Sequence, residues 1–153
     1  MPSSDIVELL SSWPQPGTGN AGPVIRYGPG ALKLAYETPV NRVAVVTVPL
    51  CLQFVCGHPN DEVLQSHPLY ARGLQFYSVH RVSSSSWLAA IEKANSVHPR
   101  HDPATFLKDK EHLVFTFQDE TVEVLALIPD GRQPSFIVCD SWAEANALLA
   151  SEA

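Results

Sequence analysis

Three His-Pro dipeptides in the middle third of the chain bring imidazoles, carboxylates and stiff backbone together. They occur at His58-Pro59, His67-Pro68 and His98-Pro99. Proline restricts the backbone and favours loops and helix ends, where a scaffold usually displays its reactive side chains. Imidazole exchanges protons near neutral pH and is a common metal ligand. The sequence therefore predicts that a functional site lies in these connections.

The connection around His98 has the pattern closest to a metal site. His98 and His101 are separated by two residues, Arg100 lies between them, and Asp102 follows directly. Divalent ions accept such a mixture of ligands, but a zinc site needs a third protein ligand besides two imidazoles. The structural interpretation is that Pro99 ends one helix and Asp102 caps the next, with His98 beside a helix C-terminus. We expect the structural interpretation, and a metal-binding protein that uses His98, His101 and Asp102 is the alternative.

A thiol, an imidazole and two carboxylates lie within seven residues at the end of an apolar run, as Cys56, His58, Asp61 and Glu62. A cysteine nucleophile needs a base nearby in space, and sequence neighbours are usually badly aligned for that role. A thiol in an apolar run is more often a small buried hydrophobe. Asn60, Asp61 and Glu62 also suit the first turn of a helix. We expect these residues to be structural.

The third connection offers a hydrogen-bond donor and a cation for an anionic group, in Tyr70 and Arg72 after His67. We expect instead an irregular loop in which Tyr70 covers the edge of the core, and binding of an anionic group is the alternative. His80 and His112 fall in or beside predicted strands, where we expect structural or cross-strand roles. The candidate ligand-binding residues of the chain are therefore His58, Asp61, Glu62, His67, Tyr70, Arg72, His98, Arg100, His101 and Asp102.

Familiar signatures for catalysis or cofactors are missing from the sequence. There is no G-x-S-x-G elbow, Walker loop, zincin pair or calcium loop. Gly17, Gly19 and Gly22 match a dinucleotide-binding fingerprint only in the first two glycines, and no clear strand precedes them. We expect no cofactor.

Composition predicts a packed acidic protein. The chain has 153 residues, 45% of them hydrophobic and 17% charged, with a net charge of −6. Negative charge disfavours nucleic acids and anionic membrane surfaces, and suits a basic protein partner or a cationic ligand. The N-terminus has no secretory signal pattern, and three cysteines without such a signal are typical of reduced thiols. We expect a cytoplasmic protein.

Hydrophobic periodicity predicts the following elements. A first helix spans residues 4–13, and a mobile connection follows near 14–23. Strands are expected at 24–27, 31–37, 43–56 with an interruption or bulge at Pro49, 76–82, 113–117, 121–125 and 135–139. Helices are expected after Asn60, from the serine run through Ala94, from Asp102 to Leu107 and at 142–150 behind a capping box.

These elements predict a single α+β domain over residues 1–153. We expect one mainly antiparallel sheet of five to seven strands, with three to five helices packed largely on one face. The leading functional hypothesis is a module that binds a small-molecule ligand or a protein partner without its own catalysis. The alternative is a small enzyme whose site joins the 58–72 and 98–102 loops at one end of the sheet. A homodimer is a further expectation, through an aromatic cluster at Trp87 or Phe76.

Overall fold

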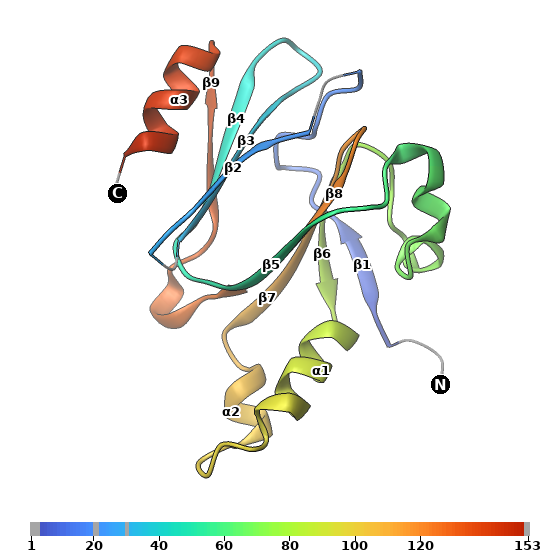
Figure 1. Ribbon diagram of the computed structural model, residues 1–153, viewed down its shortest axis with the longest axis vertical. Coiled ribbons are helices and arrows are strands. Elements are labelled where there is room, and N and C mark those ends of the chain that lie inside the picture. Colours follow the sequence, from blue (N-terminus) through green and yellow to red (C-terminus); the bar gives the residue numbers. More distant parts are fainter. Residues whose placement is uncertain (1–3, 20–21, 30, 152–153) are drawn as a thin grey trace.

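The computed structural model describes residues 4–19, 22–29 and 31–151. Over these residues the chain forms nine strands in two antiparallel sheets, three α-helices and three short 3₁₀ helices (Figure 1). The coarse α+β class is therefore confirmed, whereas the expectation of one sheet with helices on one face is only partly met.

The larger sheet has five strands. In spatial order they are β1 (Ile6–Leu9), β6 (Val79–Ser83), β7 (Lys110–Thr116), β8 (Thr121–Leu127) and β5 (Cys51–Gly57). The smaller sheet contains β2 (Val24–Tyr27), β3 (Leu32–Glu37), β4 (Val43–Val48) and β9 (Ser135–Cys139) in that order.

The main core lies between the two sheets. Alternate residues of β3 and β4 face alternate residues of β7 and β8, and Phe115 packs edge-on against Trp13 and Tyr36. Each sheet has one apolar face that must leave water, and facing sheets satisfy both at once. The central positions of this core are fully buried: Leu32, Leu34, Val46, Leu113, Phe115, Val122 and Val124.

The two outer faces are covered by different segments. Helix α3 (Trp142–Ala150) packs on β3 and β4, so these strands are buried on both sides. The 3₁₀ helices η1 (Asp61–Ser66) and η2 (Tyr70–Arg72) cover part of the larger sheet. Helices α1 (Ser86–Asn95) and α2 (Pro103–Leu107) pack together near one end of this sheet, and η3 (Pro129–Gly131) precedes β9 (Figure 1). None of the helices in the described residues is long and apolar enough to cross a membrane.

One element prediction was wrong, and another was met only in part. The expected first helix is instead strand β1, which pairs with β6 from Ile6↔Ser83 to Leu9↔His80. The expected 43–56 strand is divided at Pro49 into β4 and β5, which belong to different sheets. Proline cannot donate to a ladder, so the chain changes sheets at this point. Strand β5 is an edge, and Cys56 on it is exposed rather than buried.

The described part of the 14–23 connection is attached to the core, and residues 20–21 lie outside the described residues. The Gln15 Oε1 accepts from the Val79 amide at 2.8 Å, and its Nε2 donates to the Leu10 and Trp13 carbonyls. Tyr36 donates its hydroxyl to the Pro14 carbonyl at 2.6 Å. The Gln15 side chain thus supplies the acceptor that continues the β1–β6 pairing beyond β1.

Replacing Gln15 by leucine should therefore destabilise the protein by about 1–3 kcal/mol, because the Val79 amide loses its acceptor inside the fold. Urea unfolding followed by tryptophan fluorescence measures this change. Gln133→Leu is the matched control, since Gln133 is exposed and its substitution should stay within about 0.5 kcal/mol of wild type. Equal losses in the two variants would contradict an anchoring role for Gln15.

Candidate functional site

A carboxylate held by two imidazoles lies on the outer face of the larger sheet. Glu123 projects from β8, and His112 lies on the neighbouring strand β7. His112 Nε2 lies 2.9 Å from Glu123 Oε1, and His67 Nε2 lies 3.0 Å from Oε2. His67 comes from the connection after η1, so both carboxylate oxygens are engaged by residues from distant parts of the chain.

Other hydrogen bonds fix the orientation of both rings. The Leu69 amide donates to His67 Nδ1 at 3.0 Å, so Nε2 carries the ring proton and donates to Glu123. His112 Nδ1 lies 2.8 Å from Ser85 Oγ, and this oxygen accepts from the Leu88 amide at the start of α1. A continuous polar chain therefore runs from α1 through β7 to β8 and then to the His67 connection.

The electrostatics of this site keep Glu123 ionised. Burial alone would raise its pKa, but the hydrogen bonds and charges of His112 and His67 outweigh burial and lower the pKa to about 2. Its side chain is still 23% exposed. Each carboxylate oxygen has two lone-pair positions, so a ligand can still bond to Glu123 beside the imidazoles.

A pocket of about 270 Å³ opens over this network. Asp5 is a second carboxylate in its wall, where it accepts from the amide and hydroxyl of Ser86 at 2.7 and 2.8 Å. Trp87 contacts His112 edge-on with ring centroids 5.2 Å apart. The complete lining is Asp5, Val55, His67, Pro68, Leu69, Ser86, Trp87, His112 and Glu123. The pocket therefore combines two acids with an aromatic and aliphatic wall.

Among the predicted site residues between His58 and Arg72, only His67 lines this pocket. His58 and Glu62 are exposed, and Asp61 accepts a hydrogen bond from the Tyr77 hydroxyl. The Asp61 amide also donates to the Gln118 carbonyl at 2.9 Å, which ties η1 to the β7–β8 turn.

Tyr70 and Arg72 have structural contacts nearby. Tyr70 packs against the apolar cluster beneath η1 and η2, with its ring 6.2 Å from that of Phe76. Arg72 Nε donates to the Asp5 backbone carbonyl at 2.8 Å. Both residues therefore hold the segment that carries His67 against β1 and β6.

The residues of the His98 connection lie elsewhere. This connection is at the far end of α1 and α2, well away from η1 and η2 (Figure 1). His101 Nε2 lies 3.1 Å from Glu92 Oε1, while His98 Nδ1 accepts from the Arg100 amide. Asp102 caps α2 by accepting from the Thr105 amide at 3.0 Å.

The two loop regions are therefore not brought together, as the enzyme alternative required. Nowhere in residues 4–19, 22–29 and 31–151 do three or more His, Cys, Asp or Glu side chains group so that they could hold a metal ion.

The hydrogen-bond partner of the Cys56 thiol is a carboxylate rather than an imidazole. Cys56 Sγ donates to Glu120 Oε2 at 3.0 Å. Burial and the neighbouring Glu120 carboxylate raise the pKa of this thiol to about 12, which keeps it protonated at neutral pH. A protonated thiol is a poor nucleophile, so Cys56 is not part of the site.

Sequence reasoning placed His112 among structural residues and assigned no role to Glu123. His80 is buried as expected, with Nε2 accepting from the Gln75 amide and burial lowering its pKa. In contrast, His112 and Glu123 form the centre of the site. The alternation of the β7–β8 hairpin could have placed His112 and Glu123 on its outer face among apolar residues. It could not show that His67 and Ser85, from other segments, bond to them.

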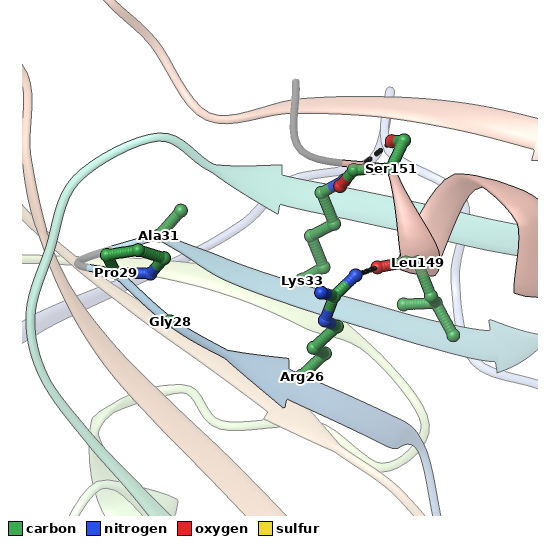
Figure 2. A pocket seen from close by; sticks show the side chains of 7 residues that line it. All are labelled: Arg26, Gly28, Pro29, Ala31, Lys33, Leu149 and Ser151. Carbon is green, nitrogen blue, oxygen red and sulfur yellow. Dashed lines mark hydrogen bonds between the residues drawn. The ribbon is translucent and has the colours of Figure 1, made fainter.

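A second pocket, of about 280 Å³, lies at the C-terminal end of α3 (Figure 2). Arg26 and Lys33 reach into it from β2 and β3. Lys33 Nζ donates to the Leu148 and Ser151 carbonyls at 2.8 and 2.7 Å, and Arg26 donates to the Leu149 carbonyl. Burial, and secondarily Arg26, lower the pKa of Lys33. These cations bond to the last carbonyls of α3, at the negative end of the helix dipole. We therefore assign Arg26 and Lys33 a structural role.

Comparison of the chain with models of protein families, with curated proteins and with solved structures finds no match. The functional argument therefore rests on the geometry of the pocket around Glu123.

Glu123→Gln should destabilise the protein by about 2–4 kcal/mol at pH 7, because one imidazole N–H then faces an amide N–H₂ group instead of an oxygen. Urea unfolding measures the change. Glu8→Gln is the matched control, since Glu8 is an exposed strand glutamate and its loss should be nearly neutral.

The pH dependence tests the same interaction. The Glu123 pKa is lowered in the folded state from 4.5 to about 2, so its stabilisation is complete above pH 4.5 and disappears as the pH falls toward 2. At about 1.4 kcal/mol per pKa unit, the full contribution is about 3 kcal/mol. The stability difference between wild type and Glu123→Gln should therefore shrink over this range. A constant difference would show that the Glu123 charge is not responsible.

Proposed function

We propose that the protein is a binding protein whose pocket over Glu123 holds a cationic group, either an alkylammonium or a guanidinium on an apolar arm. The observation that carries this proposal is the pairing of two carboxylates, Asp5 and Glu123, in one small pocket with apolar walls. These two are the acidic residues among the side chains that line the pocket.

Four features support a cation on an apolar arm as the ligand. Glu123 stays ionised far below neutral pH, and its oxygens retain lone pairs for a further donor. Trp87 offers an aromatic surface, on which cations bind favourably. Val55 is 50% exposed and lies directly opposite Glu123 on β5, so an aliphatic arm has a surface to cover. The net charge of −6 adds long-range attraction for a cation.

The probe for this proposal is benzylammonium, with benzyl alcohol as its neutral counterpart. Benzylammonium should shift the NMR signals of the Trp87 indole and the Val55 amide in a saturable way, with a dissociation constant of about 1 mM as expected for so few contacts. Benzyl alcohol should bind at least about tenfold more weakly, because it has no charge for Glu123. Equal binding of the two compounds would overturn the proposal.

A matched pair of variants locates the site without disturbing the network. Val55→Lys should abolish binding, because the new ammonium group lies at the pocket mouth. Leu52→Lys adds the same charge on β5 at an exposed position outside the pocket, and should bind like wild type. A lysine-containing peptide and its acetylated form distinguish the two sources of the cation. Tighter binding of the unmodified peptide than of benzylammonium indicates a basic protein partner. Tighter binding of benzylammonium than of the peptide indicates a small-molecule ligand.

A second candidate function rests on a different observation, the alignment of Ser85, His112 and Glu123. A helix cap needs only a lone pair from the Ser85 hydroxyl, which leaves the hydroxyl proton to donate to His112 Nδ1. The order of nucleophile, base and acid is that of acyl-transfer enzymes. Ser85 and His112 also line a cavity of about 400 Å³ with Leu88, Leu107 and Lys110.

The corresponding reaction is ester hydrolysis. Ser85 Oγ bonds to the ester carbonyl carbon while its proton passes to His112, and His112 returns that proton to the departing alcohol. Water then releases the acid by the same route and restores the Ser85 hydroxyl.

Ser85→Asn separates catalysis from capping, because asparagine caps a helix as well as serine but is no nucleophile. A fluorophosphonate probe should label Ser85 in wild type and not in this variant, with the labelled residue located by mass spectrometry. Ser141 is an internal control, since it caps α3 in the same way but its hydroxyl bonds to the Glu144 amide rather than to a ring nitrogen. Labelling of neither serine, or of both equally, would reject this second function.

A further inference from the structure

Strand β9 is an edge strand with little protection. It pairs with β4 on one side, and no pairing on its other side occurs in the described chain. Its five residues, Ser-Phe-Ile-Val-Cys, carry no charge, and its register with β4 has no bulge. Phe136 and Ile137 are 39% and 56% exposed. An apolar edge of this kind is a template for pairing with another strand.

The other three edges of the two sheets are each modified. Strand β1 carries Glu8, and β2 carries Arg26. Strand β5 contains a bulge between Cys51 and Gln53, which interrupts a regular ladder. Charges and bulges are the usual means by which proteins prevent edge pairing. Strand β9 therefore differs from the other edges because it has neither a charged residue nor a bulge that would hinder pairing.

We propose that β9 pairs antiparallel with β9 of a second copy of this chain, joining the two four-stranded sheets across a two-fold axis at Ile137. Such a register places Ile137 opposite Ile137 and Phe136 opposite Val138. A two-fold interface must be self-complementary, and an uncharged strand meets this condition without repulsion. The interaction is independent of the cation pocket, which lies on the other sheet.

The charges at the two ends of β9 favour a second copy of this chain as the pairing partner. Arg132 precedes β9, and Asp140 follows it. Antiparallel pairing about Ile137 brings the start of one strand to the end of the other, so Arg132 of each copy lies at the end of the interface that contains Asp140 of its partner. Asp140 already bonds to Arg42 at 2.8 Å but remains largely exposed, which leaves it accessible to a second cation. A parallel arrangement would instead bring like charges together.

The apolar surface beside the strand also suits this arrangement. Ile137 and Leu148 of α3 line a hollow of about 130 Å³ on the outer face of the smaller sheet. Directly opposed residues of paired strands project to the same face. The two Ile137 side chains would therefore meet beside this hollow and remove its apolar wall from water.

Sedimentation velocity over a series of protein concentrations tests the proposal. Wild type should show a reversible monomer–dimer equilibrium, and Ile137→Lys should raise the dissociation constant at least tenfold. Val97→Lys is the matched control, because Val97 is 89% exposed in the connection after α1 and should leave the constant unchanged. Circular dichroism and urea unfolding establish that both variants are folded.

The antiparallel orientation of the two strands is tested by exchanging the charges at their ends. Arg132→Glu should weaken the dimer, and Arg132→Glu combined with Asp140→Arg should restore it. Three results would overturn the proposal: a monomer throughout the wild-type series, a dimer unaffected by Ile137→Lys, or no recovery in the double variant. Loss of benzylammonium binding with the dimer intact would reject only the proposed ligand.

Discussion

The structure depends on the burial of two apolar sheet faces against each other. Phe115, Tyr36 and their neighbours lie between the sheets, and neither sheet can remove this face from water by itself. Their packing leaves two outer faces to be covered from the remaining chain. Helix α3 covers the smaller sheet, with its ends held by Ser141 at the start and by Lys33 and Arg26 at the end (Figure 2). The larger sheet is covered only in part by η1 and η2, and the candidate pocket lies beside this cover.

Glu123 attaches the segment of η1 and η2 to the larger sheet, through its bond to His67. A carboxylate on a sheet face is costly to bury alone, and its two imidazole partners provide the compensation. These partners connect β8 with β7 and with the segment that contains His67, while Ser85 extends the connection to α1. The same arrangement that stabilises the covering segment leaves an ionised acid at the base of a pocket, which is the basis of the proposed cation binding. Because β9 belongs to the other sheet, association through that edge leaves the pocket open.

Much of the fold follows from local patterns. The β7–β8 hairpin, β2, β9, α2 and α3 were predicted within a few residues, because alternation, Asp102-Pro103 and the Ser141 cap act over short distances. Residues 6–9 failed because Ile6, Leu9 and Leu10 fit helical spacing as well as a strand, and pairing with β6 decides between them. In the 43–56 run the interruption at Pro49 was predicted, but the assignment of β4 and β5 to different sheets was not. Of the candidate site, only His67 was identified among the pocket residues, since Glu123 and His112 gain their meaning from partners far along the chain.

The sequence by itself determined the α+β class, most strand and helix positions, the acidic charge and the prominence of histidine. These properties are set by residue type and by spacings of two to four residues, which any part of the chain expresses locally. Only the tertiary structure decided that the strands divide into two sheets at Pro49, that His67 reaches Glu123 while His98 and His101 do not, and that β9 lies at the edge of the smaller sheet. Each of these outcomes depends on which apolar faces pack against each other, and that packing involves segments from the whole chain.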